Sequence, residues 1–355
     1  MISRRALQVS MLLAGLAPWL GVRAAPAGKA WRVGALYWSS TIAGQVAMRQ
    51  GLETRIADLN RAAQQANTPE IHLHPRVAGD GPDGITRQIE HMQAMVAAGL
   101  DALIVQPTDN AALAAPLAAA NLAGIPVIAY DQYISTGTLA AYISSDNYQA
   151  GYLAGEYLAS TFRVGTTIRL VLVEYPAVSS TVERLNGFLD GLKDRRRAFQ
   201  IVRSYRAVTP AAGRVAGRLI LQDFPDTGSI DAIFAVNDGA GLAVVETLAR
   251  AGRHEIGIAT IDGDPAALPY IRAGSLLRID VAQFCGPLGA QVADTLHDLL
   301  RGRAVPARIL IPTFPITQDT LPRYPGWAGP IPAAFKKHWA SSDPVWHGAS
   351  ARTPP

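Results

Sequence analysis

The sequence predicts an α/β protein made of two doubly wound lobes. Short apolar runs alternate with helical segments along most of the chain, which is typical of parallel sheets covered by helices. The 355 residues are enough for two domains, each with its own core. In both halves of the chain, apolar runs end in a polar or acidic residue: Gln106, Asp131, Glu174, Asn237 and Asp262.

The composition is that of a globular protein and disfavours a nucleic-acid partner. Apolar residues make up 49% of the chain and charged residues 17%. The formal charge of +4 arises in the first 24 residues, which contain three arginines and no acid, whereas the rest of the chain has 29 basic and 28 acidic residues. Phosphate binding requires a clustered positive field, so we expect no nucleic acid to bind.

The amino terminus has the features of an export signal. Arg4 and Arg5 precede an apolar run from Val9 to Leu20 that is too short to span a bilayer. Val22-Arg23-Ala24 then offers small residues for signal peptidase. The paired arginines fit a twin-arginine signal or an ordinary secretory signal. In either case we expect residues 1–24 to be a signal peptide and the mature protein to be periplasmic.

The first half of the chain contains the clearest βαβ unit, from Leu103 to Gln132, in which strand, Ala/Leu-rich helix and strand follow one another. Ligands of open parallel sheets bind beyond the carboxyl ends of the strands, which makes Thr108, Asp109, Asp131 and Gln132 candidate site residues. The predicted elements are the strand Trp31–Trp38, a helix with Val46, Leu52, Ile56 and Leu59 on one face, the strand Ile71–Ala78, the helix Ile85–Ala98, the strand Leu103–Val105, the helix Asn110–Leu122 and the strands Ile125–Tyr130 and Leu139–Ser145.

The loop Gly79–Gly84 literally matches the GxGxxG dinucleotide-binding motif. It follows the second predicted strand instead of the first, and Pro82 stands inside it. We therefore interpret it as a tight loop before a helix.

The second half repeats the pattern and then changes composition. Beyond Thr313 the chain is rich in Pro, Trp and Gly, and we expect residues 323–355 to form a Pro/Trp-rich tail that wraps over the protein. The predicted elements are the helix Asn147–Ser160, the strand Ile168–Glu174, the helix Thr181–Arg196, the strand Phe199–Tyr205, the helix Ala211–Phe224, the strand Ala232–Val236, the helix Ala240–Ala251, the strands Ile256–Ile261 and Leu276–Gln283, the helix Gly286–Leu300 and the strand Arg308–Ile311.

Residues that would indicate catalysis or metal binding form no pattern. The chain has no GxSxG motif, and His254-Glu255 is not followed by the second histidine of HExxH. The seven histidines have no metal-ligand spacing. Cys285 is the one cysteine and lies in an apolar stretch, so we interpret it as a buried small side chain. We expect no enzymatic activity, no cofactor and no metal site.

These residues together resemble the type I periplasmic binding proteins, in particular the ribose- and galactose-binding branch. The resemblance extends over roughly Arg32 to Ile311 and implies two Rossmann-like lobes joined by a three-crossing hinge. It places residues 25–145 and 284–312 in lobe 1, and residues 146–283 and 313–322 in lobe 2. The motifs that carry it are Pro107-Thr108-Asp109, Gly124 to Asp131, Ser145-Asp146-Asn147 with Gly151, Glu183-Arg184 with Gly187-Phe188, Asn237-Asp238, Asp262-Gly263 and Ala282-Gln283.

The resemblance implies ligand contacts at Asp131, Asn237, Asp262 and Gln283. Carboxylates and amides pair well with neighbouring hydroxyl groups, and charge-assisted hydrogen bonds are the stronger ones. Asp238 is a further candidate. Asn237 and Asp238 follow a strand, however, and could instead only cap the following helix or hold the hinge.

Two aromatic residues and one glutamine complete the predicted site. Tyr37 and Trp38 end the first strand, where a ring could stack on the C–H face of a sugar, and Trp38 could equally be a core residue. The resemblance would place one arginine at Gln132 and a second near Val182, so we expect a cleft without arginine. Acids and aromatic rings could then hold a sugar or a cationic solute.

Two functions follow from this interpretation. The first is a monomeric periplasmic protein that closes on a small, sugar-like ligand and delivers it to the permease of an ABC importer. The alternative is a ligand-sensing partner of a membrane histidine kinase, for an amine or N-oxide type of ligand. The tail would serve as a docking surface in that case, or would pack across the hinge in either case.

Overall fold

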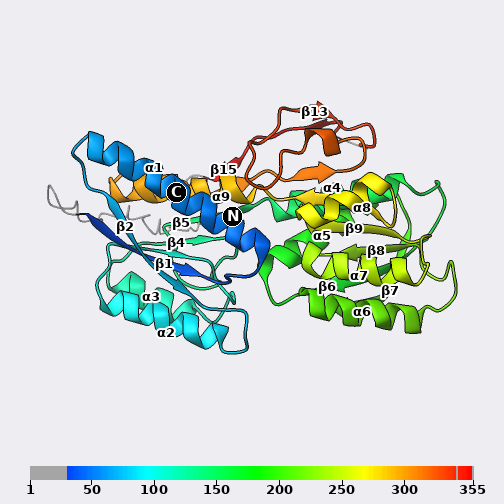
Figure 1. The fold of residues 1–355 in the computed structure, drawn as a ribbon, viewed down its shortest axis with the longest axis horizontal. Helices are drawn as coiled ribbons and strands as arrows, with labels where there is room; N and C mark the ends of the chain where they lie inside the picture. The colour runs from blue at the N-terminus through cyan, green and yellow to red at the C-terminus, as the bar shows by residue number, and fades with distance from the viewer. Residues whose placement is uncertain (1–29, 341–342, 354–355) are drawn as a thin grey trace, which may run out of the picture.

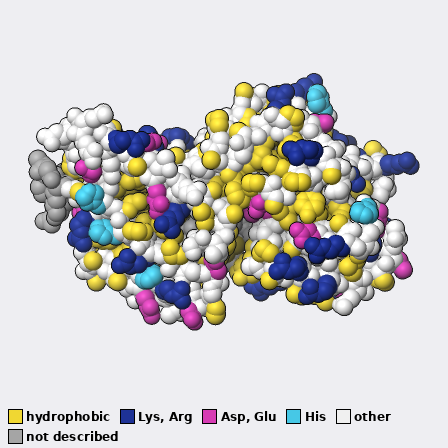
Figure 2. Space-filling view, viewed as in Figure 1, with side chains coloured by type: hydrophobic (Ala, Val, Ile, Leu, Met, Phe, Trp, Pro, Cys, Tyr) yellow, Lys and Arg dark blue, Asp and Glu magenta, His cyan; other side chains and the backbone are white. Residues whose placement is uncertain are grey.

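The computed structural model describes residues 30–340 and 343–353. The predicted signal peptide lies outside these ranges. Two α/β lobes lie side by side (Figure 1), each built on its own sheet, which confirms the predicted fold class. No helix in the described ranges has the length and apolar character that crossing a membrane requires. Figure 2 shows apolar, basic and acidic side chains intermingled over both lobes on the face in view.

Lobe 1 is a seven-stranded sheet with helices on both faces. Its elements are β1 (Trp31–Tyr37), α1 (Ala43–Gln65), β2 (Ile71–Val77), α2 (Gly84–Ala97), β3 (Ala102–Val105), α3 (Ala114–Leu122), β4 (Val127–Tyr130), β5 (Ala141–Ser145), α9 (Cys285–Leu300), β11 (Arg308–Ile311) and β15 (Ala351–Thr353). The strand order is β15-β11-β5-β4-β3-β1-β2, and β15 alone among these strands is antiparallel to its neighbour. The chain reverses its winding direction at β1, which is where such sheets bind ligands.

Lobe 2 has the same winding around a six-stranded sheet. Its elements are α4 (Asn147–Ser160), β6 (Ile168–Glu174), α5 (Ser179–Asp194), β7 (Phe199–Arg206), α6 (Pro210–Asp223), β8 (Ala232–Ala235), α7 (Asp238–Arg250), β9 (Gly257–Asp262), α8 (Leu268–Ala273), β10 (Leu277–Ala282) and β12 (Phe314–Ile316). The strand order is β12-β10-β9-β8-β6-β7, with β12 antiparallel to β10. The winding reverses between β6 and β8. The residue numbers at which the chain crosses from one lobe to the other remain a prediction.

The core follows from the alternation of side chains along the strands. In β1, Val33, Ala35 and Tyr37 are buried on the face covered by α1 and α9, whereas Leu36 packs on the opposite face with residues of α2 and α3. The first of these clusters continues into lobe 2, so a single hydrophobic core runs through both lobes.

One predicted helix begins later than expected. The helical pattern begins at Asn110, but α3 begins at Ala114. The carboxylate of Asp109 accepts hydrogen bonds from the backbone N–H groups of Ala111 and Ala112, both at 2.8 Å, and holds a turn there. The Asn110 carbonyl meanwhile accepts from Ser135 N at 2.7 Å. The Ser135 bond occupies the carbonyl that a helix beginning at Asn110 would pair with Ala114 N, and Ala114 N instead donates to the Ala111 carbonyl at 3.1 Å.

The C-terminal segment, residues 323–353 without 341–342, crosses both lobes. It forms a small hairpin of β13 (Phe335–Lys336) and β14 (Val345–Trp346), seen above lobe 2 in Figure 1, before β15 joins the sheet of lobe 1. The Trp346 indole donates to the Thr313 carbonyl at 2.7 Å, beside β12. The Lys337 ammonium lies 3.0 Å from the Glu156 carboxylate of α4, with both side chains buried.

Candidate functional site

A cavity of about 540 Å³ lies between the lobes, at the carboxyl ends of the strands of both sheets. Loops after β1 and β4 form its wall on lobe 1, and loops after β6, β7, β8 and β9 form its wall on lobe 2. The volume is in the range of cavities that hold small molecules. We call this cavity the cleft.

Seven of the ten predicted site residues line the cleft, whereas Thr108, Asp109 and Tyr37 do not. Thr108 instead donates to Gln88, and Asp109 accepts from the backbone of the turn that follows it. Tyr37 is 1% exposed in the core of lobe 1, where its hydroxyl donates to Glu53 at 3.1 Å and the Arg49 guanidinium lies 4.7 Å from its ring centre. Strand alternation explains this position, because Tyr37 continues the face of β1 that α1 covers. Contact of the other seven with a ligand stays a prediction; they are Trp38, Asp131, Gln132, Asn237, Asp238, Asp262 and Gln283.

Asp131 is a buried acid that lobe 1 brings to the cleft. It follows β4 with a φ of +63°, a conformation that Asp tolerates better than most residues. Its carbonyl accepts hydrogen bonds from Tyr142 at 3.2 Å and Ser144 at 3.0 Å, and its carboxylate accepts from Gln106 at 3.0 Å. Burial raises the pKa of Asp131 to about 6, while Gln106 and Arg184 oppose the shift.

Asp262 is the centre of a polar network on the opposite wall. Its Oδ1 accepts from Arg184 at 2.9 Å and from Gln283 at 2.7 Å. Arg184 also donates to Asn147 at 2.9 Å, and Gln283 accepts from Ser145 at 2.8 Å. Both side-chain donors use the same oxygen of Asp262, and the backbone N–H of Asp238 also hydrogen-bonds this carboxylate. Burial raises the pKa of Asp262, and the Arg184 charge opposes this.

The prediction that the cleft lacks arginine was wrong. Arg184 lines it, whereas Val182, the position near which the resemblance places an arginine, is 40% exposed. Helix α5 begins at Ser179, so Ser180, Thr181 and Arg184 share the side that faces the cleft. The Glu183-Arg184 motif in the sequence was the indication that could have identified this residue.

Gln132, where the resemblance would place the other arginine, connects the two lobes. Its amide donates to the Ser180 hydroxyl at 2.7 Å and accepts from the Ser179 hydroxyl at 3.2 Å. Both serines lie in the first turn of α5 in lobe 2. The lobes are therefore in direct contact at the rim of the cleft.

Asn237 is a helix cap as well as a cleft residue. Its Oδ1 accepts from Ala240 N at 3.3 Å, at the beginning of α7, and its amide donates to the Val208 carbonyl at 2.9 Å. These contacts match the capping alternative and hold the amide in place at the cleft wall.

Asp238 forms a buried acid pair with Asp280 of β10. Asp238 Oδ1 and Asp280 Oδ2 are buried without a conventional donor, and the carboxyl groups can hydrogen-bond to each other once one is protonated. Burial raises the pKa of Asp280 to about 8 and that of Asp238 well above its usual range. Burial therefore favours the protonated form of the pair.

Several lining residues were missing from the sequence prediction, among them Met48, Asp80, Asp264 and Trp327. Five aspartates line the cleft, and Arg184 is the one basic residue among the lining residues that the structure describes. Since Arg184 already pairs with Asp262, the cleft is acidic. This chemistry suits a ligand rich in hydroxyl donors or one that carries positive charge.

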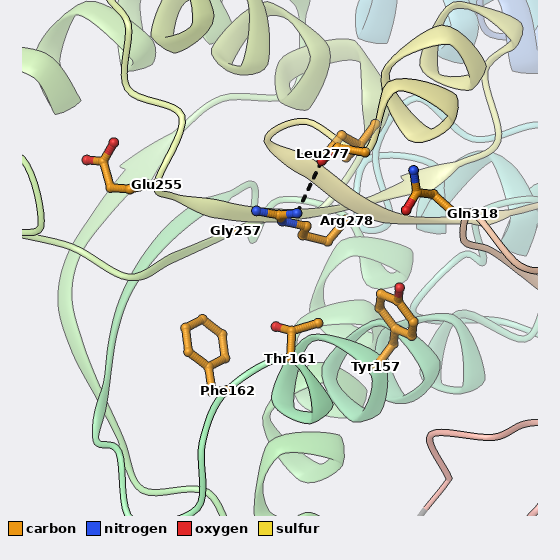
Figure 3. Close-up of a pocket in the computed structure, with 9 residues that line it drawn as sticks. Tyr157, Thr161, Phe162, Glu255, Gly257, Leu277, Arg278 and Gln318 are labelled. Atoms are coloured by element: carbon orange, nitrogen blue, oxygen red, sulfur yellow. Dashed lines mark hydrogen bonds between the residues drawn. The ribbon is translucent and has the colours of Figure 1, made fainter.

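A second cavity, of about 300 Å³, lies in lobe 2 between the end of α4 and the starts of β9 and β10. Figure 3 shows Tyr157 and Thr161 on one side and Arg278 on the other, with the guanidinium donating to the Gly274 carbonyl at 3.2 Å. This is the amino-terminal edge of the sheet, away from the cleft. Ligands of parallel sheets bind at the opposite edge, so we take the cleft as the functional site.

Comparison with known proteins agrees with this geometry. The family model described as "periplasmic binding protein domain" matches residues 33–304. The ribose import binding protein of Escherichia coli is 28% identical over 233 residues, which is 64% of this chain and 75% of that protein. A putative rhizopine-binding protein of Rhizobium meliloti is 27% identical over 255 residues, or 70% of this chain and 81% of that protein.

Solved structures share the fold. The myo-inositol-binding protein of Caulobacter superposes with a TM-score of 0.72 at 24% identity, covering 88% of this chain and 98% of that one. A solute-binding protein of Actinobacillus succinogenes with bound D-allose gives a TM-score of 0.69 at 22% identity, covering 83% of this chain and all of that one. With the family match over most of its length, the chain belongs to the type I periplasmic binding proteins, in the branch of the ribose import binding proteins.

Proposed function

We propose that this protein is an exported solute-binding protein that closes its two lobes on a small polyhydroxylated ligand and delivers it to the permease of an ABC importer. The observation that carries the proposal is the cleft itself. Asp131 from lobe 1 faces the same cavity as Asp262, Arg184 and Gln283. Acceptors and donors that arise from both sides of a hinge can engage several hydroxyls of one ligand at once and hold the lobes together.

The relatives support the class of ligand. The curated relatives are named for ribose, rhizopine and xylitol, and solved structures with the same fold contain bound D-allose and myo-inositol. Each of these molecules presents several hydroxyl groups on a small carbon skeleton. The acidic cleft fits such ligands because carboxylates accept hydrogen bonds from hydroxyls.

A thermal-shift screen followed by calorimetry tests the proposal. The panel contains D-ribose, D-allose, D-galactose, myo-inositol and xylitol, with trimethylamine N-oxide and glycine betaine as amine-type probes. We expect at least one sugar or polyol to raise the melting temperature and to bind with one-to-one stoichiometry. A panel in which no sugar or polyol binds would overturn the proposal.

The second candidate is a ligand-sensing partner of a membrane histidine kinase. The excess of aspartates over arginine in the cleft favours it, because carboxylates and aromatic rings attract cations. Binding of trimethylamine N-oxide or betaine in the same panel, with no binding of any sugar, would support the ligand class of this candidate. A histidine-kinase gene beside this one, in place of permease and ATPase genes, would favour sensing over transport.

We also propose that the protein acts without catalysis, as a periplasmic monomer. The names of the relatives support a binding role. Unchanged NMR spectra of the bound sugar after prolonged incubation test the absence of catalysis. Cell fractionation tests the location, and light scattering coupled to gel filtration tests the monomeric state.

A further inference from the structure

The C-terminal segment enters the cleft at Trp327. This residue lies 65 positions after Asp262 in the chain, yet its indole N–H donates to the Asp262 carbonyl at 2.7 Å. Close by, the Tyr324 hydroxyl donates to the Gly263 carbonyl at 3.0 Å. Trp327 is half-buried and lines the cleft together with Trp38 of lobe 1.

Trp327 is fixed from both lobes. Its side chain binds the end of β9 in lobe 2, while its carbonyl accepts a hydrogen bond of 3.0 Å from the N–H of Gly286, at the beginning of α9 in lobe 1. Beyond it, Trp346 and Lys337 attach the segment to lobe 2, and β15 attaches it to lobe 1. The ring is therefore held in one orientation at the cleft wall.

The chemistry of indole then decides what Trp327 can offer a ligand. Indole has one hydrogen-bond donor and no acceptor, and that donor is already bound to the Asp262 carbonyl. Only the apolar ring surface remains for the cavity. A pyranose or cyclic polyol has C–H faces as well as hydroxyls, and the neighbouring carboxylates provide contacts for the hydroxyls.

We propose that Trp327 is a ligand-contacting residue that determines specificity, and that the C-terminal segment supplies it to the cleft as an apolar wall. The inference rests on the proposed function, since it requires the ligand to be a sugar or polyol with an apolar face. It also makes the C-terminal segment a part of the binding site, outside the region that the family model matches.

Three variants of the full chain separate the ring from its hydrogen bond. Trp327→Leu removes both, Trp327→Phe keeps an aromatic ring but removes the N–H donor, and Trp346→Phe is the matched control. The control loses an indole-to-carbonyl bond of the same length in the same segment, away from the cleft. Calorimetry measures the dissociation constant of whichever panel sugar or polyol the wild type binds most tightly.

We expect Trp327→Leu to weaken binding at least about tenfold, which corresponds to about 1.4 kcal/mol, and Trp327→Phe to weaken it less, because the ring is retained. The control should keep the wild-type affinity. We also expect the ligand-induced change in tryptophan fluorescence to diminish in both Trp327 variants and to persist in Trp346→Phe.

The outcomes distinguish the two proposals. The wild type could bind the sugar while Trp327→Leu and Trp327→Phe lose the same amount of affinity. Trp327 would then only hold the Asp262 loop in place through its hydrogen bond, and this inference would be overturned while the proposed function stands. Unchanged affinity in Trp327→Leu would also overturn it alone. If the wild type binds no sugar or polyol, the proposed function fails and this inference fails with it.

Discussion

Two aspartates at the cleft hold unusual backbone conformations. Asp131 has a φ of +63° and Asp262 a φ of +147°, and residues in such regions typically cost about 1–3 kcal/mol of strain. The surroundings hold both in place, because Tyr142 and Ser144 bind the Asp131 carbonyl and Trp327 binds that of Asp262. In each lobe, therefore, an aspartate whose carboxylate lines the cleft has a positive φ.

Asp131→Ala should abolish most of the stabilisation by ligand. A binder at a ligand concentration 100-fold above its Kd gains about 2.7 kcal/mol of unfolding free energy. Loss of the Asp131 carboxylate should remove the charge-assisted bonds that we expect it to make to the ligand. Thermal shifts with and without the best panel sugar measure this. The control Asp58→Ala removes an acid on α1 that pairs with Arg61 outside the cleft. An undiminished shift in Asp131→Ala would contradict the predicted role.

Asp280→Asn should change how stability depends on pH. An aspartate whose pKa rises on folding, from 3.8 to about 8, binds its proton more tightly in the folded state. The folded state therefore loses relative stability as the pH rises from about 4 to about 8. Asn cannot ionise, and its Oδ1 can still accept from Gly263 N, as Asp280 does at 3.1 Å.

We therefore expect Asp280→Asn to melt at a higher temperature than wild type at pH 8, with a smaller difference at pH 4. Differential scanning calorimetry in matched buffers across this range measures the two curves. If the difference in melting temperature between Asp280→Asn and wild type does not grow with pH, the raised pKa of Asp280 is not the cause of the pH dependence.

At the scale of elements, helices α4 and α5 approach each other through glycines. A Cβ at Gly151 of α4 would clash with the Arg184 carbonyl of α5, and one at Gly187 of α5 would clash with the Tyr148 carbonyl of α4. Because α5 carries Arg184 into the cleft, this close contact also fixes the partner of Asp262.

Gly151→Ala should force the two helices apart. Overpacking of this kind typically costs about 1–3 kcal/mol, and urea unfolding measures the loss. Gly81→Ala is the control, because a Cβ at that loop position meets no atom within 4 Å, and we expect it to change stability by less than about 0.5 kcal/mol. Equal stability of the two variants would contradict the packing argument.

The elements were largely predictable, because each strand and helix has a local apolar pattern. The first turn of α3 was not, since it depends on which backbone groups Asp109 and Ser135 bind. Arg184 was missed because the residue at which α5 begins decides which side chains of the helix face the cleft. Trp327 was missed because a partner 65 residues away places it, and no local pattern records such a contact.

At the scale of the whole molecule, the lobes are closed against each other. Besides the contact of Gln132 with α5, Arg308 of β11 lies 3.3 Å from Glu183 of α5. These two contacts are polar, and ligand contacts made from both sides would add to them and shift an open–closed equilibrium toward the closed form.

We expect the best panel sugar to reduce the radius of gyration in small-angle X-ray scattering of the wild type. A ligand that bridges Asp131 and the Asp262 network would favour the closed form. Asp131→Ala at the same sugar concentration should keep the ligand-free radius. A wild type whose radius does not change, although calorimetry shows the sugar bound, would mean that the hinge does not close on binding.

The short strand β15 has a consequence for solubility. It covers the outer edge of β11, whose Ile309 and Ile311 are buried, and its own three residues are exposed and include Arg352. At the other edge of the same sheet, β2 carries Pro75 and Arg76. Proline and charge on edge strands discourage pairing with another chain. The last described residues thus cover an edge that could otherwise pair with another chain, and we expect their removal to expose β11 as a template for self-association.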